Sequence, residues 1–266
     1  MATHAYGFTA APAAAEPRPQ VRRIGQADLN WALAEGWRDF KAKRGDLIIL
    51  ALVYPIVGLA TAAAAVNAAF LPMLFPLVAG LSIMGPAVAS GFYELARRRE
   101  AGLESDWGHF FDPLRDGRRA SLAILTAGLV VMFAAWLAVA ALIYAATMGP
   151  DHGLGLATFF RSLFTTSEGW ALIVAGNLAG FAFAVVTLVL SLVSFPMVVD
   201  RPENPALAVE TSIRAIAANP AATASWGVRV AVLLAIGCLP MFVGLAVVLP
   251  VLGYATWHLY TRLVAR

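Results

Sequence analysis

Metal, redox and proton chemistry in a protein depend largely on histidine, cysteine and buried charge, and this sequence has few such residues in its apolar part. The four histidines are His4, His109, His152 and His258, and the single cysteine is Cys238. Only His258 lies close to the expected membrane region, so no two histidines could hold a haem between helices. One cysteine excludes an internal disulfide and a multi-cysteine metal site. We therefore expect no cofactor or metal, and we identify no catalytic residue.

Four polar residues within or beside apolar runs remain as candidates for a functional or structural role in a membrane: Arg229, His258, Glu94 and Asn177. Arg229 lies roughly two turns inside an apolar run, where it could extend back to the surface or pair with Glu94 or Glu210. His258 lies between aromatic residues, which is typical of a membrane interface but also compatible with a proton relay or a ligand. Asn177 can hydrogen-bond across helices.

Three prolines interrupt the apolar runs: Pro86, Pro196 and Pro250. Each lacks a backbone N–H and is expected to kink its helix. In transporters such breaks expose backbone groups to a substrate, whereas in ordinary bundles they only bend the helix. The sequence favours bending, because no buried acidic residue accompanies the prolines.

The composition is typical of a membrane protein. Hydrophobic residues make up 60% of the 266 residues and charged residues 13%, whereas soluble domains carry about 25% charge. The basic residues lie between apolar runs, a pattern that indicates membrane topology rather than nucleic-acid binding. Abundant alanine and scarce lysine suggest a bacterial source.

A membrane-spanning helix needs about 20 mostly apolar residues. We expect six spans, at approximately 47–66, 73–95, 120–148, 170–199, 221–237 and 241–261. The last apolar stretch leaves open a five-span protein, in which 221–261 would be one span with or without a re-entrant segment.

Positive charge favours the six-span arrangement. Of 19 Lys and Arg residues, all but Arg161 and Arg229 lie in the terminal segments and in the loops 97–119 and 200–220. Since basic residues stay cytoplasmic, both termini are expected in the cytoplasm of a bacterium with this protein in its inner membrane. An even number of spans follows.

Three segments before the odd-numbered spans are expected to be amphipathic helices on the cytoplasmic surface, at 28–43, 105–119 and 204–220. Residues 1–27 are expected to be a disordered cytoplasmic tail, and 28–266 the integral membrane domain. The stretches 80–99 and 244–263 share five residues at a constant shift, including Pro86 and Pro250. This correspondence suggests a three-fold repeat of hairpins.

The segments "SFPMVVDRPENPALAVETSIRAIAANP" (194–220) and "GLAVVLPVLGYATWHLYTR" (244–262) resemble the bacterial predicted integral membrane proteins of domain of unknown function 2189. The segments "EGWRDF" (35–40) and "GPAVASGFYELARRRE" (85–100) are also similar to that family. The likeness extends over residues 28–264. It implies no activity that could be transferred. Some members are labelled cytochrome c oxidase subunit I-like, a role that the few histidines of this chain oppose.

The sequence thus predicts an all-α polytopic membrane helix bundle with about six transmembrane helices and short cytoplasmic amphipathic helices. Its expected function is that of a non-catalytic scaffold or assembly partner, and enzyme activity is left open. The alternatives are a small-solute or lipid transporter with kinked helices and an accessory subunit of a respiratory complex. The expected partners are the lipid bilayer and other membrane proteins that bind the amphipathic helices, and not nucleic acid.

Overall fold

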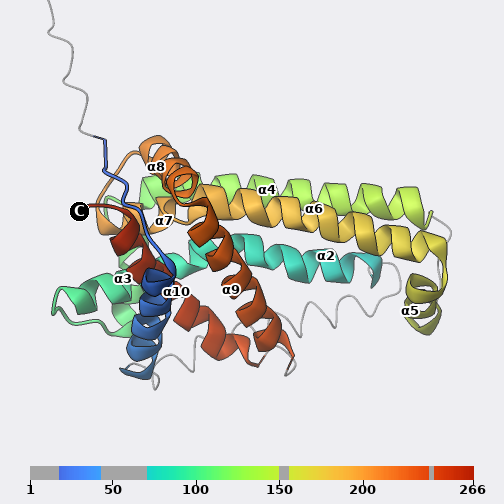
Figure 1. Ribbon diagram of the computed structural model, residues 1–266, viewed down its shortest axis with the longest axis horizontal. Coiled ribbons are helices and arrows are strands. Elements are labelled where there is room, and N and C mark those ends of the chain that lie inside the picture. The colour runs from blue at the N-terminus through green and yellow to red at the C-terminus, as the bar shows by residue number, and fades with distance from the viewer. Residues whose placement is uncertain (1–17, 43–70, 150–155, 240–242) are drawn as a thin grey trace, which may run out of the picture.

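The computed structural model describes residues 18–42, 71–149, 156–239 and 243–266, which form an all-helical structure (Figure 1). An N-terminal helix covers residues 26–42. The later α-helices and short 3-10 helices (η) are α2 (Leu71–Leu81), η1 (Ser82–Met84), α3 (Gly85–Glu100), η2 (Trp107–Leu114), α4 (Arg119–Thr147), α5 (Leu156–Thr165), α6 (Ser167–Ser191), α7 (Ser194–Asp200), α8 (Pro205–Ala218), α9 (Pro220–Cys238) and α10 (Leu245–Leu263). The all-α prediction is confirmed.

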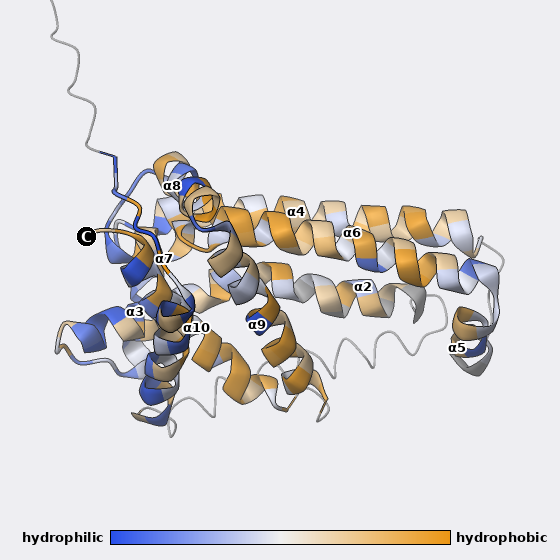
Figure 2. Cartoon of the chain, viewed as in Figure 1, coloured by the Kyte–Doolittle hydropathy of each residue, from blue (hydrophilic) through white to orange (hydrophobic). Residues whose placement is uncertain are grey.

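The longest helices are apolar on every side. In Figure 1, α4 and α6 run side by side, and α2 packs along α4; Figure 2 shows all three as largely hydrophobic. The 29 residues of α4 would extend over about 43 Å, more than the hydrocarbon thickness of about 30 Å. Large apolar side chains such as Val131 and Phe181 are about 70% exposed. A surface of this kind is stable against lipid and unfavourable in water.

Four helical stretches among the described residues are long and apolar enough to cross a membrane: Phe75–Glu100, Arg119–Thr147, Ser167–Asp200 and Pro220–Cys238. They overlap the second to fifth expected spans. The first expected span, 47–66, lies outside the described residues. The sixth, 241–261, corresponds to α10, which is not among the four, because the second half of α10 is rich in polar and aromatic residues.

The helix that begins with α6 is interrupted at Leu192 and Val193 and resumes as α7. In a continuous helix the amide of Val193 would bond the carbonyl of Val189. Here the Ser212 hydroxyl of α8 accepts from the Val193 amide at 3.2 Å and donates to the Val189 carbonyl at 2.8 Å. A side chain inserted into the hydrogen-bond ladder is a recognised cause of a kink, and it precedes Pro196 by less than one turn.

Replacing Ser212 by alanine is expected to lower the free energy of unfolding by about 1–2 kcal/mol, because a buried amide and a buried carbonyl each lose a partner. The matched control is Ser194→Ala, since the equally buried Ser194 hydroxyl bonds only the Leu190 carbonyl of the preceding turn. Thermal unfolding in detergent measures both variants. Equal losses would mean that Ser212 does not support the interruption.

The chain starts and stops its shorter helices with recognisable local features. Asn204 caps α8 by accepting from the Ala206 amide at 2.9 Å, and Pro205 is the first helical residue. Asn219 follows the last residue of α8, and Pro220 begins α9. The helix expected at 204–220 is therefore confirmed, with its ends at the residues that the sequence indicates.

The two ends of the described chain lie against each other. Val21 and Val264 form an antiparallel β-bridge, flanked by hydrogen bonds from the Arg22 amide to the Leu263 carbonyl and from the Ala265 amide to the Gln20 carbonyl. The expected disordered tail reaches residue 27, but its last part is ordered by this pairing. The composition of this stretch gives no indication of it, because the stabilising partner lies more than 240 residues away.

The polar connections gather at one end of the long helices, which we call the charged end. It contains residues 18–25, the N-terminal helix, the end of α3, η2, the start of α4, α7, the start of α8 and the end of α10, and it lies at the left of Figure 2. Contacts between distant segments hold it together. For example, the Ser121 hydroxyl of α4 donates to the Glu203 carbonyl at 2.9 Å. The start of α4, which follows the loop 97–119, therefore meets the loop 200–220, as the charge pattern requires of loops on one side of a membrane.

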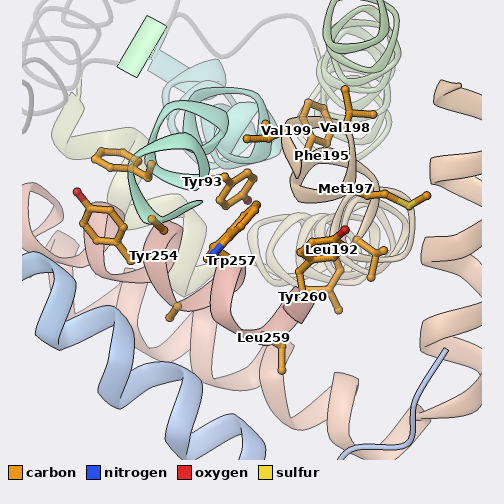
Figure 3. Packing of buried hydrophobic residues seen from close by; sticks show 14 of the residues in the cluster. Tyr93, Leu192, Phe195, Met197, Val198, Val199, Tyr254, Trp257, Leu259 and Tyr260 are labelled. Atoms are coloured by element: carbon orange, nitrogen blue, oxygen red, sulfur yellow. The ribbon is translucent and has the colours of Figure 1, made fainter. Parts of the chain in front are cut away.

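The most tightly packed core lies directly beneath the charged end. Figure 3 shows side chains from α3, α7 and α10, with Leu192, converging there, including the fully buried Trp257 and Tyr260. The side chain of Phe92 on α3 packs directly on Gly253 of α10, where an added Cβ would lie 2.8 Å from the Cβ of Phe92. A larger residue at position 253 would force these helices apart.

Candidate functional site

The end of α10 connects several helices through polar side chains. The Trp257 indole donates to Glu100 of α3 at 3.1 Å, and the Tyr260 hydroxyl donates to Asp200 of α7 at 2.9 Å. Both aromatic rings are fully buried. Their polar atoms therefore find carboxylate partners at the edge of the core, which is how buried tryptophan and tyrosine are usually satisfied. Trp257 and Tyr260 thus attach the end of α10 to α3 and α7.

His258 joins α10 to the N-terminal helix. Its Nε2 lies 2.8 Å from Oδ2 of Asp39, while Arg99 places its Nε 3.1 Å from Oδ1 of the same carboxylate. The Trp31 ring packs edge-on against the imidazole with 5.6 Å between centroids. Both His258 and Asp39 are largely shielded from solvent. The histidine is therefore part of an interhelical contact. That it lies at the membrane interface, or alternatively acts as a relay or ligand, stays a prediction.

Glu94 is the most deeply buried charged side chain of the described residues, with no exposed surface. Its two oxygens accept bonds from Arg97, at 2.9 Å from Nε and 2.7 Å from Nη2, and from Nη1 of Arg118 at 2.6 Å. Arg98 adds a further positive charge at 3.8 Å. Both carboxylate oxygens are thus occupied by guanidinium groups.

Arg118 completes this buried cluster and connects three segments. Besides Glu94, it donates to the Val199 carbonyl of α7 at 2.6 Å and to Asp116 at 2.9 Å. Burial alone would lower the pKa of Arg118, but the hydrogen bonds to Asp116 and Glu94 outweigh burial and raise it above its usual value. The side chain consequently remains a cation and keeps α3, α4 and α7 together.

The cluster is suited to holding helices in place rather than to proton transfer. Taking charges out of water is costly, and the cost is offset only if each charge is paired and hydrogen-bonded. Glu94 and Arg118 meet this condition. A general acid or base needs a polar atom within reach of a substrate, and both oxygens of Glu94 already accept bonds from arginine. The cluster therefore forms an internal brace.

A second polar group surrounds η2. Glu104, Asp106 and His109 could bring one ligand atom each within 4.8 Å of one another. The histidine is held by Asp112, 2.8 Å from Nδ1, and Nη2 of Arg98 lies 3.2 Å from its Nε2. A cation here would meet the positive charge of the guanidinium. We therefore do not assign a metal site to these residues.

Two of the other expected polar residues lie on helix surfaces. Arg229 of α9 donates to Asn30 at 2.8 Å and to Gln26 at 2.9 Å, both on the N-terminal helix. Arg229 pairs with neither Glu94 nor Glu210, the two partners expected from the sequence. Glu94 is enclosed by other arginines. Asn177 donates to the Ile173 carbonyl of its own helix. These side chains do not meet Glu94 or His258 in a common site.

Replacing Arg229 by leucine is expected to lower the free energy of unfolding by no more than about 1 kcal/mol. The bonds that it loses go to partly solvated amide side chains, and such contacts contribute little. Urea or thermal unfolding in detergent, together with a membrane-insertion assay, measures the effect. A failure to insert, or a loss comparable to that of a buried charge, would contradict this assignment.

The three prolines occupy different situations. Pro86 is the second residue of α3, directly after η1, and Pro196 is the third residue of α7, directly after the interruption near Ser212. Pro250 lies inside α10, which continues through it as one helix. The first two therefore accompany real interruptions of the expected spans, whereas the third does not end its helix.

The comparison with protein families gives a match within this region. Residues 74–200 match the model of a family described as predicted integral membrane protein, DUF2189. Over these residues the chain is similar to the DUF2189 family, which confirms the expected resemblance there. No curated protein and no solved structure matches the chain. Together with the four candidate spans, the DUF2189 match makes this an integral, multi-pass protein embedded in a lipid bilayer.

The DUF2189 match is narrower than the likeness expected from the sequence, which extended over residues 28–264. It contains the buried brace of Glu94, Arg97 and Arg118 together with Val199. The terminal segment of α10, with His258, lies outside it. The brace thus lies in the part of the chain that matches DUF2189, and α10 packs on α3 and α7, which contribute to it.

Sequence reasoning identified Glu94 and His258 but missed Arg118, Asp39 and Ser212. The basic residues at 115–119 indicated only the side of the membrane. Asp39 looked like one of several solvated charges of an amphipathic helix. A single sequence does not indicate which arginine is buried, because burial is determined by the packing of segments far apart in the chain.

Proposed function

We propose that this chain is a non-catalytic membrane protein that acts as a scaffold or assembly partner through its charged end. The observation that carries the proposal is that the polar side chains at the charged end connect different segments of the chain. Glu94 with Arg118, Asp39 with His258, and Glu100 with Trp257 each join different segments. Carboxylate and imidazole groups that could take part in catalysis instead hold the segments of the charged end together.

The proposed topology has six membrane spans, both termini in the cytoplasm and short amphipathic helices on the cytoplasmic face of a bacterial inner membrane. Two independent observations support it. Nearly all Lys and Arg residues lie in the segments that would be cytoplasmic. The bridge between Val21 and Val264 also requires these two residues on the same side, and hence an even number of crossings between them.

The proposed three-fold hairpin repeat has one structural point in its favour. The helices α3 and α10 carry the corresponding residues Pro86 and Pro250, and both helices end at the charged end with Arg98 and Arg262. They also pack directly on each other. Two equivalent units in contact are a common arrangement of internal repeats in membrane proteins.

The surface through which a partner would bind contains exposed aromatic and apolar side chains at the charged end. Trp37 on the N-terminal helix is 45% exposed, and Phe111 and Leu114 of η2 are exposed to a similar or larger extent. Basic residues, including Arg38 and Arg115, accompany them. Exposed aromatic and arginine side chains are enriched in protein interfaces, and a membrane surface would also accept them.

Affinity purification from native membranes, followed by mass spectrometry, tests the proposal when wild type is compared with Trp37→Ser. The matched control is Trp170→Ser, because Trp170 is 53% exposed at the start of α6, away from the charged end. A partner retained by wild type and by the control but lost from Trp37→Ser would support the scaffold function. Purification without a stable partner would oppose it. A respiratory complex among the captured proteins would favour the accessory-subunit alternative.

A transporter is the second candidate, favoured by the helix interruptions at η1 and at Leu192–Val193 within two candidate spans. Interrupted helices often form substrate sites. At the second interruption, however, the backbone groups of Val189 and Val193 are already satisfied by Ser212. Flux of labelled solutes or lipids in proteoliposomes distinguishes the two functions, and substrate-dependent flux would favour the transporter.

A further inference from the structure

An open hollow of about 290 Å³ lies at the charged end, beside the β-bridge that joins the two ends of the described chain. Three segments contribute to its lining, namely residues 18–25, the end of α3 and the end of α10. The lining residues are Arg22, Glu100, Thr261, Arg262 and Arg266. The lining holds three guanidinium groups and one carboxylate, and Arg266 also lies 3.5 Å from Asp200. The hollow therefore keeps an excess of positive charge.

Two of these arginines are held in place by aromatic rings. The guanidinium of Arg262 lies 4.0 Å from the centroid of the Trp31 ring, and that of Arg266 lies 4.8 Å from the Trp257 ring. Stacking of this kind orients the planar group and leaves its edge, which carries the N–H donors, free to bond. The hollow therefore has donors in fixed positions rather than mobile side chains.

The hydrogen-bond partners of the lining residues show which donors remain available. Glu100 uses one oxygen to accept from both Trp257 and Arg266, so its charge is already compensated. Within the described part of the chain, the side chains of Arg22 and Arg262 form neither a hydrogen bond nor an ion pair. Each guanidinium offers five N–H donors, so many donors at the hollow have no acceptor among the described residues.

We propose that this hollow binds a phosphate group, carried either by an anionic lipid headgroup or by a soluble phosphate compound. The planar forks of Arg22 and Arg262 match the bidentate geometry of phosphate oxygens. The hollow lies at the end of the bundle where the polar loops gather, which is where lipid headgroups and soluble anions both have access. This site goes beyond the scaffold function and does not depend on it.

The test compares wild type with Arg22→Gln and with a matched control, Arg23→Gln. The Arg22 side chain forms no hydrogen bond or ion pair with the described residues, and its backbone bonds to Leu263 and Asn219 remain in the variant. Arg23 is the next residue of the same segment and does not line the hollow. Both variants lose one positive charge, so any difference between them reports the position of that charge rather than the net charge.

Two measurements distinguish the sources of the phosphate. Isothermal titration calorimetry of the detergent-solubilised full chain with inorganic phosphate, at constant ionic strength, reports a soluble ligand. Native mass spectrometry after incubation with phosphatidylglycerol or with phosphatidylcholine reports retention of an anionic headgroup. Constant ionic strength is needed because exposed charge pairs are screened by salt.

Saturable binding of phosphate or selective retention of phosphatidylglycerol would support the proposal if Arg22→Gln weakens it about tenfold while Arg23→Gln leaves it unchanged. The measurement that shows binding identifies the source. The proposal would be overturned if neither ligand binds, or if both variants weaken binding equally, because attraction to general surface charge would then explain the result.

Discussion

Replacing Glu94 by glutamine is expected to lower the free energy of unfolding by about 3 kcal/mol. The substitution keeps the shape of the side chain but leaves Arg97 and Arg118 side by side without their common carboxylate. Breaking a buried charge pair costs about 3–5 kcal/mol. We expect the lower end of that range because Arg118 keeps its bonds to Asp116 and to the Val199 carbonyl.

Chemical unfolding in detergent, followed by tryptophan fluorescence, measures this loss. Glu35→Gln serves as the control, since Glu35 forms an ion pair with the mostly exposed Arg38, and such pairs contribute about 0–1 kcal/mol. The double variant Glu94→Gln/Arg97→Met should recover part of the loss, because it removes the cation whose hydrogen bonds go to Glu94. A similar small effect for Glu94→Gln and Glu35→Gln would mean that Glu94 is not an internal brace.

Replacing Trp257 by alanine is expected to cost about 4 kcal/mol. The side chain has no exposed surface, and removing a buried tryptophan leaves a cavity among α3, α7 and α10. The substitution also removes the hydrogen bond to Glu100 and the ring on which Arg266 stacks. We expect the end of α10 to loosen together with the bridge at Val264.

The variant Trp257→Phe separates these contributions. It keeps most of the buried apolar surface but loses the indole N–H, so a loss of about 1–2 kcal/mol is expected. Thermal unfolding gives the two values, and limited proteolysis near residues 18–25 reports the bridge. If alanine and phenylalanine cost the same, the polar contact rather than core packing would hold α10 in place.

The helices and the polar connections of this fold were not equally predictable. The apolar runs predicted the second to fifth spans, because length and hydropathy alone decide whether a helix can cross a bilayer. The helix at 205–218 was also predictable, since Asn204, Pro205 and Pro220 act within a few residues of themselves. In each case the determining interactions are local.

The connections among helices were not predictable in the same way. Glu94 could have faced lipid headgroups beside Arg97–Arg99 or turned into the bundle, and only the packing of α3 on α7 decides this. The Arg118 guanidinium bonds Glu94, which is 24 residues away in the sequence, and the Ser212 hydroxyl bonds the carbonyl of Val189, which is 23 residues away. A single sequence does not indicate such pairs.

Proline was an incomplete guide to the shape of the helices. Pro86 and Pro196 lie just after interruptions, but the second interruption begins where Ser212 enters the hydrogen-bond ladder, before the proline itself. Pro250 lies inside an uninterrupted α10. A proline thus indicates where a helix can be interrupted, and the contacts with surrounding residues determine whether and at which residue the interruption occurs.

The bridge between Val21 and Val264 has a consequence for biosynthesis. Residue 21 is translated before every described helix, yet its partner Val264 is translated after all of them. Residues 18–25 therefore lack this partner while the intervening helices are synthesised and inserted. The bridge can form only after α10 has been made, and a chain that stops before Leu263 would lack the residues that form it.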